Sequence, residues 1–320
     1  MTPEQITYLV FGIVLVVALV FDLGLMSKKS STITMKKALT QTLFWVSLAL
    51  AFFVFVWFED GKTVALEYLS AYLMEWSLSI DNIFVFILIF GFFGVKEEYV
   101  PRALLIGILM AILFRIVFIS IGIVLIERFH WLLYVFGALL LYTGFKMFTA
   151  KHDEEVSLSD NKVYRFLQRV FPLVSHDGDG KFSVIQNGKR YYTNMFVVIV
   201  MLATTDIVFA LDSIPAVFAI SQNRLVVYTS NIFAVLGLRS LFFLLKGAVN
   251  KFAYLQQGIA IVLVFIGVKM LIEIFHIKVP VFVSLLVIVI CIAASIVYSI
   301  SVANREEAKK GLAGNDRDLH

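Results

Sequence analysis

Four acidic residues stand inside stretches of sequence that are otherwise apolar. Glu75 and Asp81 lie in "EWSLSIDNIFVF" (residues 75–86), and Asp206 and Asp212 lie in "TTDIVFALDSIPAVFAI" (residues 204–220). A charged side chain at the centre of a bilayer costs about 2.5–3.5 kcal/mol on insertion scales, so such residues usually serve a function. These acids are therefore the first candidates for a functional site.

Oxygen atoms dominate the polar groups beside these acids. Asn82 follows Asp81, Ser213 follows Asp212, and the five histidines fall at or beyond the ends of the apolar stretches. Oxygen ligands suit Mg²⁺, Ca²⁺ and Mn²⁺, and they argue against Zn²⁺ and Cu⁺. We predict a divalent-cation site whose metal ligands are Glu75, Asp81, Asn82, Asp206, Asp212 and Ser213.

Two arginines, Arg115 and Arg239, also lie within apolar stretches. Two arginines against four acids leave two negative charges, which one divalent cation would neutralise. We treat both arginines, together with Asn231, as supporting groups. The alternative is structural, because the acids could pair with the arginines and simply hold helices together.

The spacing of the acids limits how they can act together. Residues six positions apart on a regular helix point about 120° apart and are separated by about 9 Å along the axis. Glu75 and Asp81 therefore cannot bind one ion from an unbroken helix, so either the helix unwinds or the acids form two tiers. Pro215 removes a backbone donor, and Ser77 and Ser79 compete for backbone hydrogen bonds. We expect local breaks near the acids and a central pair of Asp81 with Asp212.

The elements that must position these residues are membrane helices. Of the 320 residues, 60% are hydrophobic and only 16% are charged. Long apolar runs in such a chain predict an all-α polytopic membrane protein, because a membrane span needs about 20 apolar residues. We expect about nine transmembrane helices, near residues 7–26, 39–58, 66–93, 100–126, 130–149, 194–220, 225–246, 252–275 and 280–301.

The distribution of Lys and Arg predicts the orientation. Basic residues gather on alternate connections, which should be cytoplasmic, while the connections between them carry few. This pattern places the N-terminus outside and the C-terminus inside. The basic connections are those after the first, third, fifth and seventh spans and the C-terminal tail.

The two halves of the chain repeat each other. Asp81-Asn82-Ile83 corresponds to Asp212-Ser213-Ile214, and an acid precedes each Asp by the same interval. An arginine and then the similar phrases "YTGFKMF" and "FIGVKML" follow in both halves, which indicates an internal repeat. Each copy holds three helices, so the copies enter the membrane from opposite sides and form an inverted repeat.

The chain accordingly divides into five parts. They are N-terminal helices (1–60), a first three-helix repeat (61–150), a cytoplasmic insert (151–193), a second three-helix repeat (194–275) and a last helix with a cytoplasmic tail (276–320). In the insert, "KFSVIQNGKRYY" alternates around Asn187-Gly188, a pair that suits a two-residue turn. We therefore expect a short β-hairpin there.

Several phrases carry a resemblance to a known family. "EWSLSIDNIFVF", "TTDIVFALDSIPAVFAI", "SNIFAVLGLRSLFFLL" and the "GVKM" phrase resemble the TerC/Alx family of bacterial inner-membrane proteins, over nearly the full chain. The resemblance implies the LysE-type transporter group, an inner-membrane location and manganese export. Position by position, it places the family's membrane acids on Glu75, Asp81, Asp206 and Asp212.

One departure from the family pattern is visible. Where relatives commonly read "ELSD", this sequence has "ATTD" before its second-half acids. The missing carboxylate leaves Thr204 or Thr205 as a weaker oxygen ligand, and we include Thr205 among the supporting residues.

These observations lead to two functional hypotheses. The favoured one is an inner-membrane secondary transporter that exports Mn²⁺, by proton antiport; a Ca²⁺ transporter is a variant of it. The other is a membrane scaffold that assists insertion or assembly of other membrane proteins. No nucleophile-and-base or nucleotide motif indicates an enzyme. The expected partners are the transported metal ion and the lipid bilayer, without a resident cofactor or a nucleic acid, and the oligomeric state stays open.

Overall fold

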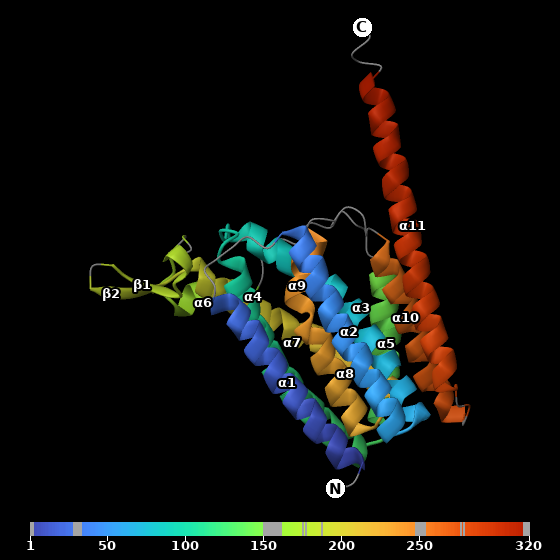
Figure 1. Cartoon of the computed structure of the whole chain (residues 1–320). Helices are drawn as coiled ribbons and strands as arrows, with labels where there is room; N and C mark the ends of the chain where they lie inside the picture. Colours follow the sequence, from blue (N-terminus) through green and yellow to red (C-terminus); the bar gives the residue numbers. More distant parts are fainter. Residues whose placement is uncertain are drawn as a thin grey trace.

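The computed structural model describes residues 3–27, 34–149, 162–174, 176, 178–186, 188–246, 254–275, 277 and 279–315, with the backbone alone at 3–4, 21–27, 81, 212, 255 and 303–315. Almost all of this part is helical (Figure 1). The elements in chain order are α1 (Pro3–Ser27), α2 (Met35–Glu59), α3 (Lys62–Phe92), α4 (Val100–Arg128), α5 (Leu132–Thr149), α6 (Lys162–Val170), η2 (Gly178–Gly180), β1 (Ser183–Gln186), β2 (Lys189–Tyr192), α7 (Asn194–Ile220), α8 (Arg224–Leu236), α9 (Leu238–Lys246), α10 (Leu255–Ile272), η4 (Glu273–Phe275) and α11 (Val281–Asn315).

Seven of the described helices are long and apolar enough to cross a membrane. The bent pair α8 and α9, which meet at 43°, makes an eighth span if it is counted as one. The first span expected from the sequence falls in α1, whose apolar stretch, Gln5–Val20, is shorter than the others. The structure thus supports an all-α polytopic membrane protein with seven or eight clear spans, against the nine predicted.

Local signals explain where several helices begin. The Thr34 hydroxyl accepts a hydrogen bond from the Lys37 amide at the start of α2, and the Asn223 side chain accepts one from the Leu225 amide (2.9 Å) at the start of α8. Pro101 stands in the first turn of α4, where its missing N–H is not needed. Gly61 precedes α3 with φ of 92°, in the left-handed region that glycine adopts without strain.

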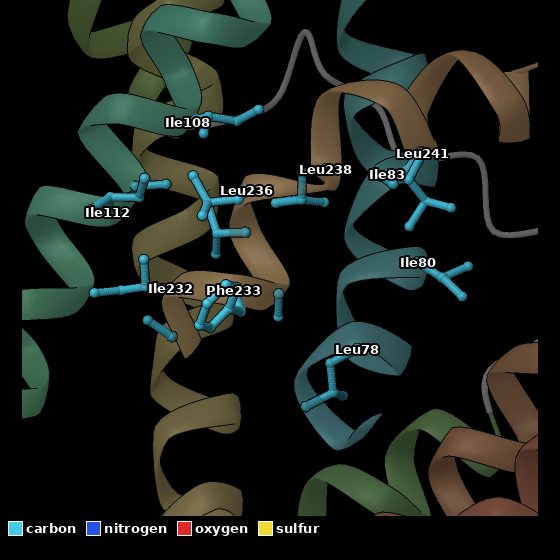
Figure 2. Packing of buried hydrophobic residues seen from close by; sticks show 14 of the residues in the cluster. Leu78, Ile80, Ile83, Ile108, Ile112, Ile232, Phe233, Leu236, Leu238 and Leu241 are labelled. Atoms are coloured by element: carbon cyan, nitrogen blue, oxygen red, sulfur yellow. The ribbon is translucent and has the colours of Figure 1, made fainter. Parts of the chain in front are cut away.

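The bundle has a buried centre and an apolar exterior. α3 packs against α7 and α8, α4 packs against α7, and α5 packs against α10. Figure 2 shows the apolar core where α3 and α4 meet α8 and α9, with Ile83, Ile112 and Phe233 among its members. The outer helices instead expose large apolar side chains, such as Val124 of α4 and Val297 of α11, each more than half exposed. Such a surface suits lipid and not water.

The first helices of the two halves run antiparallel. At one end the Ser221 hydroxyl, just after α7, donates to Glu67 near the start of α3. At the other end the Asn194 side chain, at the start of α7, donates to the carbonyl of Phe93, just after α3 (2.9 Å). Each helix therefore begins where the other ends.

The last helices of the two halves, α5 and α10, are also antiparallel, and they approach through glycines. A Cβ on Gly144 would lie 2.9 Å from the carbonyl oxygen of Ala260, and a Cβ on Gly267 would lie 2.8 Å from that of Gly137. The earlier glycine of α5, Gly137, contacts the later residue of α10, Gly267, which shows that the two helices are antiparallel. The absence of side chains lets the two backbones come close.

The polar insert forms a small substructure beside the ends of α3 and α7. β1 and β2 pair antiparallel, with Val184 opposite Tyr191, which confirms the expected hairpin; Gly188 turns with φ of 75°, and Asn187 lies outside the described residues. The Arg102 side chain of α4 donates to the Gly180 carbonyl (3.2 Å). This hydrogen bond ties the insert to the start of α4. The Lys96 ammonium, in the loop between α3 and α4, donates to Asp179 of the insert (3.1 Å).

That loop is also tied to α9. The Lys246 ammonium donates to Glu97 (2.7 Å). The hydrogen bond and the positive charge hold the pKa of the Glu97 carboxyl below its usual range. The insert, the loop after α3 and the end of α9 therefore meet at one end of the bundle.

Candidate functional site

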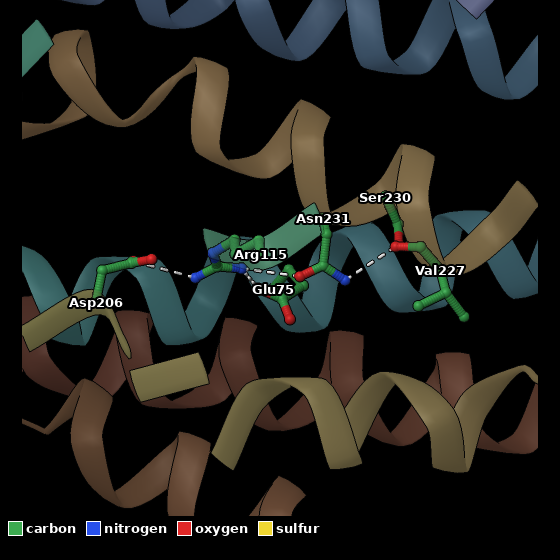
Figure 3. A network of polar contacts seen from close by, with 6 residues as sticks. All are labelled: Glu75, Arg115, Asp206, Val227, Ser230 and Asn231. Carbon is green, nitrogen blue, oxygen red and sulfur yellow. Dashed lines mark hydrogen bonds and ion pairs between the residues drawn. The ribbon is translucent and has the colours of Figure 1, made fainter. Parts of the chain in front are cut away.

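A buried polar network joins both halves of the chain in the interior of the bundle (Figure 3). Arg115 of α4 donates to Glu75 of α3 (2.5 Å) and to Asp206 of α7 (3.4 Å). Its Nη1 also donates to Oδ1 of Asn231 on α8 (2.9 Å). None of these four side chains is more than slightly exposed. Four helices thus meet around one guanidinium.

Neighbouring groups fix the orientation of this network. The Asn231 amide donates to the carbonyl of Val227, one turn earlier on α8 (3.0 Å), which directs its oxygen towards Arg115. The guanidinium is planar with donors on several sides, so it can serve two carboxylates and an amide at once. Asn231 therefore acts here as a hydrogen-bond partner of Arg115.

Several buried polar atoms of this region have no hydrogen-bond partner within the described residues. They include one oxygen of each acid, Glu75 Oε1 and Asp206 Oδ2, and the hydroxyls of Ser79 and Ser213. A buried polar atom without a partner costs about 1–3 kcal/mol. Such atoms are therefore candidates to bind water or a cation.

The depths of all four acids follow from the end contacts of α3 and α7. Glu75 lies eight positions inward from Glu67, and Asp212 lies nine positions inward from Ser221. Asp81 lies twelve positions inward from Phe93, and Asp206 lies twelve positions inward from Asn194. The antiparallel register therefore places Glu75 level with Asp212, and Asp81 level with Asp206.

Two tiers of acids result, about 9 Å apart along the helix axes. Arg115 links them diagonally, because it binds Glu75 of one tier and Asp206 of the other. The side chains of Asp81 and Asp212 lie outside the described residues. The register sets Asp81 and Asp212 at different depths, and the central pair that the sequence suggested stays a prediction.

The breaks expected near the acids are not present. α3 continues through Asp81, and α7 continues through Asp212 and Pro215. The break lies instead at Gly237, between α8 and α9, two residues before Arg239. Arg239 is buried there, 4% exposed, in the first turn of α9.

The other predicted residues have different surroundings. Asn82 and Ser213 are buried, beside Asp81 and Asp212 respectively. Thr205 is half-buried on α7, and the hydroxyl of Thr204 donates to its own helix, at the carbonyl of Val200 (2.8 Å). Ser79 is an addition, since its sequence position suggested only competition for backbone hydrogen bonds; its place one turn after Glu75 was the available signal.

The described side chains alone do not form a complete metal site. Among them, no group of three or more His, Cys, Asp or Glu residues could hold a metal ion, and Asp81 and Asp212 fall outside that set. What they form is an ion-pair network with two carboxylates to one guanidinium. Four of the six predicted ligands thus have a described side chain, and the metal site itself stays a prediction.

Comparisons with known proteins agree with a membrane protein of this kind. A family model described as "Integral membrane protein TerC family" matches residues 60–307. An "Uncharacterized membrane protein STKORF319" of Myxococcus xanthus is 43% identical over 282 residues, 88% of each chain. A "Putative membrane-bound redox modulator Alx" of Escherichia coli (strain K12) is 38% identical over 310 residues, 94% of this chain and 96% of the relative. No solved structure shows a significant match.

Proposed function

Because the chain belongs to the TerC family of integral membrane proteins, we propose that it is a multi-pass secondary transporter that exports divalent metal ions, manganese above the others, in exchange for protons. The observation that carries this proposal is the buried network in which carboxylates from both halves of the chain share Arg115. Ionisable groups inside a membrane bundle commonly mark an ion pathway.

The charges of the network support a cation as substrate. Two carboxylates around one guanidinium leave one negative charge among fully buried groups. Asp81 and Asp212 add two acids at the same two depths, and the buried Arg239 adds one positive charge. The four acids and two arginines together leave two negative charges, which a divalent ion would balance.

The arrangement of the helices supports an inverted repeat. α3 and α7, and likewise α5 and α10, are corresponding helices that run antiparallel. In the alignment of the two halves, Gly144 corresponds to Gly267, and Gly137 corresponds to Ala260. The contact of Gly144 with Ala260 is therefore equivalent to the contact of Gly267 with Gly137. A pseudo-two-fold axis in the membrane plane produces this exchange, and transporters built this way bind substrate near that axis.

The choice of manganese rests on ligand chemistry and on family resemblance. Carboxylate, amide and hydroxyl oxygens suit Mn²⁺, Ca²⁺ and Mg²⁺. The Alx relatives are named putative membrane-bound redox modulators. The single cysteine of this chain, Cys291, forms no disulfide within it, so the proposal is built on the carboxylates.

We further propose that the protein lies in the inner membrane, with its N-terminus outside and its C-terminus in the cytoplasm. The basic insert and the Lys and Arg residues near it support this orientation, because such residues favour the cytoplasmic side. Export then runs from the end that carries the insert to the end where α3 begins.

Metal flux in proteoliposomes tests the function. The unaltered chain should move Mn²⁺ more readily than Ca²⁺, Mg²⁺ or Zn²⁺. Asp81→Asn and Asp212→Asn keep the shape of the side chain but remove its charge, and each should abolish the flux while the protein still inserts. Glu127→Gln is the matched control, since it removes an exposed carboxylate at the end of α4. Normal flux in both Asn variants would exclude the carboxylate site and favour the scaffold hypothesis.

A further inference from the structure

A pocket of about 340 Å³ lies at the end of the bundle where α3 begins and α7 and α10 end. This is the end away from the insert, since α3 ends and α7 begins beside the insert. The wall combines apolar side chains of α5, α7 and α10 with the polar residues Glu67, Ser221, Gln222, Lys269 and Glu273.

The polar part of this wall is held in place by contacts between the two halves. The Ser221 hydroxyl donates to Glu67, and it also accepts a hydrogen bond from the Asn223 amide (3.1 Å). Ser221 is buried, 4% exposed. The carboxylate of Glu67 is therefore held where α3 begins and α7 ends. These two helices carry the four acids of the membrane interior.

The opposite wall supplies charges of both signs. Lys269 and Glu273 are four positions apart at the end of α10 and the start of η4, so they lie on the same side of the chain. Among the described residues, they and Glu67 give the pocket two carboxylates and one ammonium. The pocket therefore attracts cations, but the Lys269 ammonium competes with them for the two carboxylates.

The volume of the pocket suits an ion that keeps its water. Each water molecule occupies about 30 Å³ of liquid, so an ion with six waters needs roughly 180 Å³. Small divalent cations dehydrate reluctantly and are often bound through only one or two carboxylates. The pocket has room for such an ion beside Glu67 and Glu273.

The opposite end of the bundle does not carry the same groups. By the correspondence of the two halves, Val198 and Phe90 take the places of Glu67 and Ser221, and both are buried. Lys146 corresponds to Lys269, but it is exposed. The charged pocket thus breaks the symmetry between the halves. An exporter needs such asymmetry if its two openings are to bind the ion with different affinities.

We propose that this pocket is the exit site for a hydrated divalent cation, with Glu67 and Glu273 as its ligands and Lys269 as the built-in competitor that keeps its affinity low and so favours release. The inference rests on the proposed export function. In this proposal Lys269 helps to set the direction of transport. The proposal does not depend on which buried acids bind the metal within the membrane.

Direct binding of Mn²⁺ to the purified full chain in lipid nanodiscs tests the site without transport. In an Asp81→Asn/Asp212→Asn background, Mn²⁺ electron paramagnetic resonance should still detect one weak site. Glu67→Gln should abolish it, and the amide can still accept the Ser221 hydrogen bond. Lys269→Met should tighten it about tenfold, because a nearby positive charge is removed. Lys146→Met, the matched control, should leave it unchanged.

Transport gives a second readout. Mn²⁺ added on the exit side should inhibit efflux at about tenfold lower concentration in Lys269→Met than in the unaltered chain or in Lys146→Met. Binding that survives Glu67→Gln, or an affinity that falls or stays the same in Lys269→Met, would overturn the proposal. If the unaltered chain transports no metal but the nanodisc result holds, the export function fails and the binding site stands.

Discussion

At the scale of single residues, Arg115 determines how the buried acids can coexist. It is fully buried and binds Glu75, Asp206 and Asn231 from three other helices. Without this guanidinium, two carboxylates would remain unpaired in a medium of low dielectric constant, where such charge is costly. Arg115 is thus needed for stability whether or not the site also binds a metal.

Removal of Arg115 should therefore destabilise the protein strongly. We expect Arg115→Met to lower the free energy of unfolding in detergent by about 3–5 kcal/mol, the usual cost of breaking a buried ion pair from one side. The stability of Arg115→Lys should lie between that of the unaltered chain and that of Arg115→Met. Lysine keeps the charge, but its ammonium lacks the planar fork that reaches three partners. The measurement is equilibrium unfolding followed by tryptophan fluorescence.

Two further variants make this prediction specific. Arg224→Met breaks the exposed pair with Glu127 and should cost far less, because exposed ion pairs contribute little to stability. Adding Glu75→Gln to Arg115→Met should recover part of the loss, because one unpaired charge disappears. Equal stability of Arg115→Met and Arg224→Met would contradict the buried network.

The sequence identified these residues better than it paired them. An acid or arginine in an apolar run is visible by type alone, which is how Glu75, Asp206 and Arg115 were found. Which arginine meets which acid depends on how four helices cross, and no local pattern contains that crossing. Asn231 was accordingly a candidate, but its bond to Arg115 was not predictable from its position in the sequence.

At the scale of elements, the helix break falls at Gly237, between α8 and α9, and not beside the acids. Ser77 satisfies its hydroxyl within α3, at the carbonyl of Leu73 (2.6 Å), so it does not unwind the helix. Pro215 is accommodated within α7, as neighbouring helices often permit in membrane bundles. Gly237 itself has a right-handed helical conformation, and Trp45 of α2 packs beside it. The phrase "LGLR" was the available signal for the bend.

The contact of α5 with α10 yields an element-scale prediction. Gly144→Leu and Gly267→Leu should each lower the free energy of unfolding by about 1–3 kcal/mol or more, because a larger side chain collides with the backbone of the facing helix. Gly91→Leu is the matched control, since nothing lies within 4 Å of its Cβ position. Thermal unfolding in detergent measures all three, and tolerance of Leu at both contact positions would refute the close approach.

At the scale of the whole molecule, orientation decides which opening is the exit. The sequence predicts that orientation, because Lys and Arg are distributed unevenly. The register that sets two tiers of acids, by contrast, needed the contacts at both ends of α3 and α7. Apolar composition fixed the membrane class, but it could not separate α1, with its short apolar stretch, from a full span.

Cysteine labelling tests that orientation. In a Cys291→Ser background, Lys189→Cys in the exposed hairpin should react with an impermeant thiol reagent only after the membrane is opened. His130→Cys, between α4 and α5, should react in intact cells. Gly180 is a poor position for such a cysteine, because its φ is 76° and a Cβ would meet the Tyr99 ring at 2.6 Å. The reverse labelling pattern would overturn the proposed direction of export.

The energy source for export is the remaining question for the whole molecule. Moving one charge against the membrane potential costs about 2.3 kcal/mol per 100 mV, so a divalent cation leaving a negative interior costs roughly twice that. The chain contains no G-x-x-x-x-G-K-[ST] motif for ATP, so another gradient must supply this energy. Carboxylates that bind metal also bind protons, and the two compete for the same oxygens.

We therefore expect proton-coupled antiport, with Glu75 or Asp206 as the proton carrier. Each has one oxygen bound to Arg115 and one oxygen without a partner in the described residues, and each lies one tier from an acid of its own helix. In proteoliposomes loaded with Mn²⁺, a proton gradient directed inward should drive Mn²⁺ out. Glu75→Gln or Asp206→Asn should weaken this dependence on pH more than it weakens Mn²⁺ binding, because the aspartates at 81 and 212 remain. If Mn²⁺ flux ignores an imposed pH gradient at fixed membrane potential, the antiport mechanism is wrong even if the metal site is right.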